Sequence, residues 1–489
     1  MDRAGRFLQV WIVALALLLS GCIAPGARQS SSAMRRANEL DAGRAISNAA
    51  VRSETWPQSD WWKMYGDPQL DALLERALAD NPRLAIAVDR IAEAQALAGH
   101  ARASTLPTLR AEASSIHTHF SENEIFPPPL GGGDFWDNSA QLMLSYDLDV
   151  WGRDEKNLAA ALAAVQVSRY DAQTARLILA GTIVRNYAAL ALQFELKDSG
   201  LAILDDRQRT LAIIQRRIAA GIGTELEAQE IITEIAAEHA ELEQIDMRIA
   251  LLRHTLGALT GAGPGAGDAL QRPRLQLDRM VELPSSIPAD LLGRRPDVVA
   301  ELWRVERASD NIDVAKAAFY PNINLRAFAG LVSFGFSKFF DASSESTGVG
   351  PAISLPIFDG GNLRSGLRAR TAEYDAAVHA YNATLVDALT DIANQLTTLE
   401  ALQRVERERN AALNAATRAH QLALQAFAAG LTDSLNVLHT QTALSMQRSL
   451  LADVHFQQLA SWAALNQALG GGLSPASAET MPVASADHF

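Results

Sequence analysis

The sequence contains the run Leu148-Asp-Val-Trp-Gly-Arg153, and a related run, Leu355-Pro-Ile-Phe-Asp-Gly-Gly361, occurs in its second half. Each run ends a stretch of alternating apolar and polar residues, and a long Ala-rich stretch follows each. Three landmarks keep a nearly constant offset: residue 321 corresponds to 107, 360 to 152 and 430 to 221. Repetition of this kind indicates one structural unit used twice. The order helix, strand, strand, long helix, turn, long helix is therefore predicted to occur twice, with residues 66–258 echoed by residues 295–470.

The alternating stretches predict two β-hairpins. Apolar residues occupy every second position from Ala140 to Val150, and residues 109–114, 322–331 and 349–357 alternate similarly. One apolar and one polar face is the pattern of a strand in a membrane barrel, where ~9–11 tilted residues cross the bilayer. A soluble two-layer sheet has the same alternation. Four strands cannot close a membrane barrel alone, because the smallest have ~8 strands, so spanning strands require a barrel shared between subunits.

Residues 153–220 and 360–429 predict two very long helices, because neither stretch contains proline. At ~1.5 Å per residue each would be roughly 100 Å long. The first return segment has the 3,4 spacing of a coiled-coil seam, at Leu242, Ile245, Ile249, Leu252 and Leu256. Antiparallel helical hairpins are therefore expected, with turns near 221–224 and 430–433. Shorter helices are expected to begin at Asp67-Pro68 and to continue past Asn81-Pro82 to about Ala103.

The N-terminus has the features of an export signal. Arg3 and Arg6 precede the apolar run from Val10 to Leu19, which is too short to span a membrane, and Leu19-Ser-Gly-Cys22 follows. This tetrapeptide resembles a bacterial lipobox, in which the cysteine is acylated, and Cys22 is the only cysteine in the chain. A chance cysteine near the cleavage site is the alternative. Because Ile23 and not Asp follows, the resemblance to sorted lipoproteins favours a lipid anchor in the outer membrane.

Composition excludes several classes of function. The 489 residues are 48% hydrophobic but only 6% aromatic, which suits closely packed helices, and the net charge of −13 argues against a nucleic-acid partner. The chain has no His-Glu-x-x-His, Gly-x-Ser-x-Gly or cysteine cluster, and Gly261–Gly267 is not followed by the Gly-Lys-Ser/Thr of a phosphate loop. His117 and His119 are expected at a loop edge. We therefore predict no enzyme activity, no cofactor and no metal site.

The predicted organisation has six parts. They are a signal peptide (1–21), a lipidated N-terminal tether (22–60), a first repeat (61–258), a linker (259–289), a second repeat (290–472) and a disordered tail (473–489).

Several motifs together resemble the outer-membrane efflux proteins of the TolC type. They are Trp61-Trp62-x-x-Tyr65-x-Asp67-Pro68, Leu148–Arg153, Ile287-Pro-Ala-Asp-Leu-Leu-x-Arg-Arg-Pro-Asp297, Leu355–Gly361 and Ala468-Leu-Gly-Gly-Gly472. The resemblance covers about residues 56–472, and the lipobox is similar to that of the NodT-like lipoprotein branch of this family.

The resemblance implies an α+β membrane protein with an internal two-fold repeat. Three protomers of four strands would form a shared 12-stranded transmembrane β-barrel, and the long helices an antiparallel coiled-coil α-barrel in the periplasm. The helices near 70–103 and 290–318 would form a girdle around its middle. The homotrimer would be the exit duct of a tripartite efflux pump for small molecules such as drugs, docked to a periplasmic adaptor and an inner-membrane transporter. The alternatives are the duct of a type I protein-secretion system and a structural lipoprotein with a solid helical stalk.

The turns between the long helices are the predicted periplasmic tip. Gly221, Gly223 and Gly430 suit turns that need positive φ, and these turns are expected to dock the adaptor. The tip or gate residues expected beyond them are Glu225, Glu227, Glu230, Asp433, Asn436, Leu438 and His439. In the TolC-like pattern acidic rings narrow the entrance, and Glu227 matches one such position. Asn436 and His439 occupy positions where that pattern has aspartates, so the aspartate ring is not carried over. Leu435 and Leu438 are expected to seal the tip or to lie in the helical seam.

Overall fold

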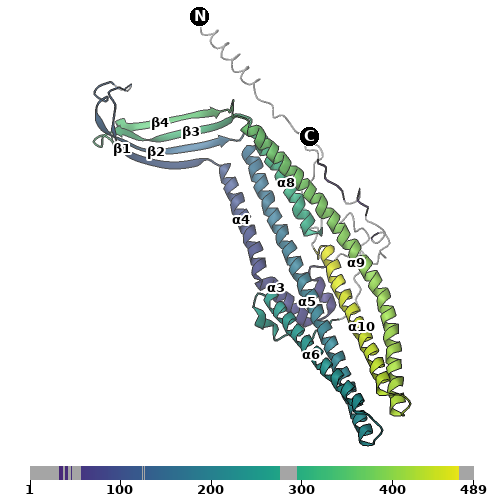
Figure 1. Ribbon diagram of the computed structural model, residues 1–489. Coiled ribbons are helices and arrows are strands. Elements are labelled where there is room, and N and C mark those ends of the chain that lie inside the picture. Colours follow the sequence, from purple (N-terminus) through teal and green to yellow (C-terminus); the bar gives the residue numbers. More distant parts are fainter. Residues whose placement is uncertain are drawn as a thin grey trace.

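The computed structural model describes residues 32–36, 39–41, 46, 57–123, 125, 127–275 and 294–472. The described chain is elongated, with a β-sheet at one end and the turns of two long helical hairpins at the other (Figure 1). The signal peptide, Cys22 and the tail at 473–489 lie outside the described residues.

The four strands form one antiparallel sheet in the order β1-β2-β3-β4. Their bounds are Thr108–His119, Asp134–Leu148, Asn322–Phe334 and Glu345–Ser354. The polar residues expected on one face are paired across the sheet, as in Glu112 opposite Gln141. One expectation was wrong: β4 ends at Ser354, two residues before Pro356, which has no N–H for the ladder. His119 is the last residue of β1 and His117 lies two residues before it, so both are exposed at the edge of the loop, as expected.

The two helical hairpins match in length. α5 (Arg153–Ala219) and α9 (Asn362–Ala428) each have 67 residues, and α6 (Glu225–Leu259) and α10 (Ser434–Ala468) each have 35. Each helix of the second hairpin therefore begins 209 residues after its counterpart. The expected seam is confirmed, because Leu242, Ile245, Ile249 and Leu256 are buried. One segment of α5 is long and apolar enough to cross a membrane, but a core helix has the same composition.

Four helices form a layer between the sheet and the middle of the molecule. α4 (Pro82–Ser104) contacts α5, α5 contacts α8 (Pro296–Ala317), and α8 contacts α9, so α4 and α9 lie at its two edges (Figure 1). The expectation of a girdle was wrong for α4 and α8, which extend lengthwise beside α5 and α9. Among the described elements, α3 (Pro68–Asp80) and the short 3-10 helices η2 (Trp61–Tyr65) and η3 (Pro264–Gly267) lie at the middle, here called the waist.

Part of the N-terminal tether contacts the helical body. The amide of Asn382 on α9 accepts a hydrogen bond from Arg35 N (2.8 Å) and donates one to the carbonyl of Ala33 (3.0 Å). Further along, Ile46 packs in an apolar cluster with Leu389 and Ile392. The described residues of the tether therefore lie against α9.

Candidate functional site: the hairpin tips and the waist

Both hairpin turns are built in the same way. Gly221 and Gly430 each adopt φ +72°, and their N–H groups donate to Ile218 O (2.9 Å) and Phe427 O (3.0 Å). The N–H groups of Ile222 and Leu431 donate to the carbonyls one residue before Ile218 and Phe427, respectively. This pair of hydrogen bonds is the usual C-terminal cap of a helix that ends in glycine. The expected positive φ is confirmed for these two glycines.

Gly223 serves a different purpose from the one expected. Its φ is not positive, but a Cβ there would lie 2.8 Å from the backbone nitrogen of Ile218. The absence of a side chain therefore lets the turn pass closely over the end of α5.

The expected gate residues have local roles in starting the return helices. Thr224 and Glu227 form a capping box, in which Glu227 Oε2 accepts from Thr224 N (3.3 Å) and Thr224 Oγ1 accepts from Glu227 N (3.4 Å). Asp433 caps α10 by accepting from Asn436 N (3.1 Å). Glu225, Glu230 and His439 are exposed. Within the described part of the chain, these polar residues form no ion pair between the two hairpins.

An apolar cluster joins the two hairpins just behind the turns. This tip cluster contains Ile214, Ala228, Ile231, Ala423, Phe427 and Val437, which come from α5, α6, α9 and α10. The guanidinium of Arg217 lies 5.3 Å from the centre of the Phe427 ring. Leu438 packs against the cluster, as the seam alternative expected. Leu435 is exposed, so the seam alternative was wrong for this residue. The other exposed apolar residues around the turns are Ile222, Leu226 and Leu431.

Buried titratable groups lie between the tip and the waist. His420 Nε2 is 3.8 Å from Asp206, and burial lowers the pKa of His420 while the Asp206 carboxylate opposes this shift. Arg207 on α5 binds Glu234 (3.0 Å) and Glu238 (2.9 Å) on α6. Burial raises the pKa of Glu238, and Arg207 opposes this. These contacts fix α5 against its neighbours.

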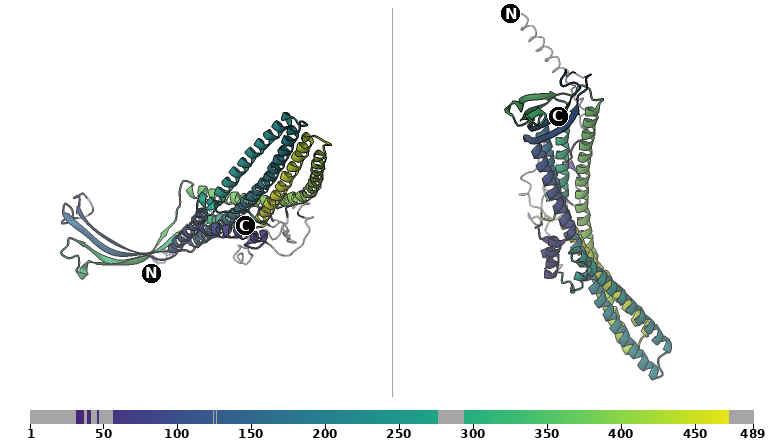
Figure 2. Two further views of the ribbon diagram at one scale, coloured as in Figure 1. Left: turned by 90° about the horizontal axis from the view of Figure 1, so that it is seen from below. Right: turned by 90° about the vertical axis from the view of Figure 1, so that its left-hand side faces the viewer.

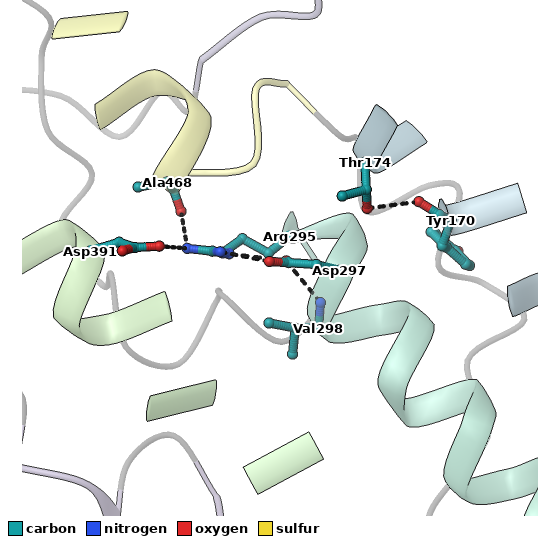
Figure 3. A network of polar contacts seen from close by, with 7 residues as sticks. All are labelled: Tyr170, Thr174, Arg295, Asp297, Val298, Asp391 and Ala468. Atoms are coloured by element: carbon teal, nitrogen blue, oxygen red, sulfur yellow. Dashed lines mark hydrogen bonds and ion pairs between the residues drawn. The ribbon is translucent and has the colours of Figure 1, made fainter. Parts of the chain in front are cut away.

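Parts of three family-like motifs that are distant in sequence, around Trp61, Arg295 and Gly470, meet at the waist. Arg295, at the start of α8, is buried and binds Asp297 (2.6 Å), Asp391 on α9 (3.4 Å) and the carbonyl of Ala468 at the end of α10 (3.3 Å) (Figure 3). The hydrogen bond from Thr174 to the carbonyl of Tyr170 on α5 lies beside this network (Figure 3). Arg295 thus connects three helices of the second repeat.

The glycines after α10 also belong to the waist. Gly470 and Gly472 have φ of +90° and +88°, and a Cβ at either position would collide with the backbone of Arg294 or Gln58. Trp61, Trp62, Pro296 and these glycines line one cavity of about 390 Å³. The motifs therefore mark the place where the two ends of the folded body meet.

A further buried polar group fixes the first helices to α5. Tyr187 donates to Asp67 Oδ2 (2.8 Å), and that carboxylate also accepts from Arg274 N (2.7 Å). Burial raises the pKa of Tyr187 above its usual range. Within the described residues, no group of three or more His, Cys, Asp or Glu side chains is placed to hold a metal.

The described chain combines two long helical hairpins with a four-stranded sheet. The family model "Outer membrane efflux protein" matches residues 73–262 and 287–471. The chain therefore belongs to the outer membrane efflux protein family, whose members include the TolC-type channels. Its function is export at the outer membrane.

Relatives and solved structures agree with this assignment. The chain is 43% identical over 371 residues to the fusaric acid resistance protein FusA of Burkholderia cepacia, covering 75% of this chain and 69% of FusA. It is 28% identical to the multidrug resistance outer membrane protein MdtP of Escherichia coli, covering 96% and 97%. The crystal structure of the outer membrane protein VceC of Vibrio cholerae superposes with a TM-score of 0.81 at 33% identity, covering 86% and 100%.

Proposed function

We propose that three copies of the chain close into one channel, which is the exit duct of a tripartite efflux pump for small molecules such as drugs. The proposal rests on one observation. At three levels along its length (the sheet, the upper helices and the helices below the waist), the described part of the chain is an open layer with two edges that pack on nothing further in the same layer. The sheet has edges β1 and β4, and the upper helical layer has edges α4 and α9. Below the waist the order of contacts is α6-α5-α10-α9, with edges α6 and α9 (Figure 2). Joining the edges of successive copies closes all three levels at once.

The sheet supports a membrane location for this ring. Unpaired backbone groups in lipid cost several kcal/mol each, so β1 and β4 need partners, and three sheets give a closed barrel of twelve strands. Exposed aromatic residues gather at both ends of the sheet: Trp136, Phe336 and Phe340 at the loop end, and Trp151 and Phe358 at the helix end. Two aromatic bands flank the apolar zone of membrane barrels.

In this assembly the duct is passive. The energy comes from an inner-membrane transporter, and a periplasmic adaptor docks on the tips at Gly221, Gly223 and Gly430. The exposed Ile222, Leu226, Leu431 and Leu435 provide an apolar surface for that contact. The names of FusA and MdtP support small-molecule cargo. Acylated Cys22 would add a lipid anchor in the outer membrane.

Two measurements test the duct. Native mass spectrometry in detergent should give three copies, and the purified protein should conduct ions in planar bilayers. A stable monomer would contradict the shared barrel. A trimer without conductance would favour a structural stalk.

The resting tip is proposed to be narrowed by packing and polar contacts, with Glu225, Glu227, Glu230, Asp433, Asn436, Leu438 and His439 around it. Leu438→Ser weakens the tip cluster and Glu227→Ala removes the capping box, so either should raise single-channel conductance. Leu431→Ser, at an exposed position, is the matched control. If neither variant differs from the control, the constriction lies elsewhere in the duct.

A further inference from the structure

Two exposed helix faces are made almost entirely of small residues. The face on α4, here called the α4 seam, consists of Ala85, Asp89, Ala92, Ala96, Gly99 and Ala103. On α9 the α9 seam consists of Ser365, Ala369, Ala372, Ala376, His379 and Ala383. Both follow the alternating three- and four-residue spacing that places side chains on one face of a helix. α4 uses a different face, with Ala94, Ala98 and Ala101, to pack within its own chain.

The internal repeat indicates what covers these seams, because each seam has an equivalent helix face in the other repeat. α4 and α8 begin at Pro82 and Pro296, an offset of 214 residues, whereas α5 and α9 are offset by 209. With these offsets, the α4 seam corresponds to the face of α8 that packs on α5, and the α9 seam to the face of α5 that packs on α8.

Burial shows that the corresponding faces are in contact within the chain. On α5, Ala160, Ala163 and Val167 are buried, whereas their counterparts Ala369, Ala372 and Ala376 on α9 are exposed. On α8, Val299 and Asp310 are buried, whereas their counterparts Ala85 and Ala96 are exposed. The corresponding buried and exposed residues are Ala160–Ala369, Ala163–Ala372, Val167–Ala376, Val299–Ala85 and Asp310–Ala96.

We infer that the α4 seam of one copy packs against the α9 seam of the next copy, in the same antiparallel register in which α8 packs on α5. This inference rests on the proposed closed ring and specifies its helical interface residue by residue. α4 and α9 are the edge helices of the layer, so a second copy brings the two seams face to face (Figure 1). Ser32 of the tether hydrogen-bonds His379 near one end of the α9 seam (3.2 Å), and the repeat assigns the rest of the seam to the next copy.

The chemistry of the two junctions differs. Inside the chain, Lys156 on α5 binds Asp310 (3.0 Å) and Asp313 (3.6 Å) on α8. Their counterparts between copies are Ser365, Ala96 and Gly99, which carry no charge. Similarly, Arg304 binds Asp171 (2.7 Å), but the counterpart of Asp171 is Ala380. Apart from Asp89, His379 and Arg90, the counterpart of Arg304, the junction between copies is therefore a contact of small residues. Helices approach closely at such a contact because the interaxial distance depends on side-chain size.

Cross-linking tests the register. In a Cys22→Ser background, Ala96→Cys with Ser365→Cys should join neighbouring copies when a short bis-maleimide is added. The matched control is Asp89→Cys with Ser365→Cys, since Asp89 lies on the same seam but about two turns, or roughly 10 Å, away. If a trimer forms and the control pair cross-links as well as the Ala96 pair, the inferred register is wrong although the ring stands. If no trimer forms, the ring itself is refuted.

Charge substitution tests the correspondence between the junctions. Ala96→Asp alone places an unpaired carboxylate in the seam and should lower trimer stability at least about tenfold. Adding Ser365→Lys recreates the Lys156–Asp310 pair between copies and should restore the trimer. Adding Ala372→Lys, two turns away on the same seam, should not restore it. The inference is overturned if Ala96→Asp leaves the trimer unchanged, or if both lysines rescue it equally.

Discussion

Phe427→Ala should loosen the tip without unfolding the waist. Phe427 is buried in the tip cluster, and its ring also faces the guanidinium of Arg217 at 5.3 Å. Removing a buried phenylalanine side chain costs about 3–5 kcal/mol, and losing the cation–π contact adds ~0.5–1 kcal/mol. Because the cluster joins both hairpins at their ends, the cost applies to local opening of the tip.

Hydrogen exchange of the backbone amides measures this opening. A loss of about 3 kcal/mol corresponds to a decrease in protection of roughly a hundredfold or more, since 1.4 kcal/mol is tenfold. The decrease should be confined to the last turns of α5 and α9 and the first turns of α6 and α10. Amides around Tyr187 at the waist should keep their protection, because that region has its own core.

Leu431→Ala is the matched control for this change. Leu431 lies four residues beyond Phe427 but is 82% exposed, so its truncation should change tip protection by less than about twofold. The reasoning is refuted if Phe427→Ala and Leu431→Ala give the same protection, because the cluster would then not hold the hairpins together.

Three further outcomes are expected. Burial lowers the pKa of His420 from its ordinary 6.5, so the unfolded chain binds a proton at this residue more readily than the folded chain does. The stability of the fold should therefore decrease as the pH falls through 6.5. His420→Gln should remove this contribution, as measured by thermal unfolding at about pH 5.5 and about pH 7.5. Gly470→Ala should abolish folding through its collision with Arg294, as judged by trimer yield, whereas Gly263→Ala, also at positive φ but in open space, should only lower the melting temperature. Mass spectrometry should find Cys22 acylated at the mature N-terminus, and Cys22→Ser should stay at the membrane; an unmodified Cys22 contradicts the anchor.

Elements governed by periodicity were predictable from the sequence. The repeat, the long helices, the coiled-coil seam and the strand pairs follow from spacing that each segment carries within itself. The end of β4 was missed because alternation continues through Ile357, although Pro356 cannot donate to the ladder. The two tip glycines with positive φ were also predictable, because turns between helices commonly end in this way.

Features that depend on contacts between distant segments were not predictable. Nothing in the sequence around Arg295 indicates that its partners are Asp391 and the carbonyl of Ala468. Gly223 has the composition of a positive-φ turn residue, but its requirement arises from the backbone of α5 passing beside it. The roles of Glu227 and Asp433 as helix caps were not predicted either, although Thr224 three residues before Glu227 is a capping-box signal.

The α5–α8 contact within the chain and the inferred α4–α9 contact between copies differ in composition, although the two repeats have the same fold. The difference follows from the exposure of α4 and α9 before the ring assembles. Before assembly, α4 and α9 expose the faces that α8 and α5 already bury. Leucines on those faces would give each free copy an apolar stripe of the kind that promotes nonspecific association. Charged pairs would leave unpaired charges to be desolvated on assembly. Alanine, serine and glycine avoid both problems, because they expose little apolar area alone yet permit close helix contact. On this reasoning specificity between copies comes from shape and strand pairing, and the ion pairs Lys156–Asp310 and Arg304–Asp171 of the junction within each chain have no counterpart between copies.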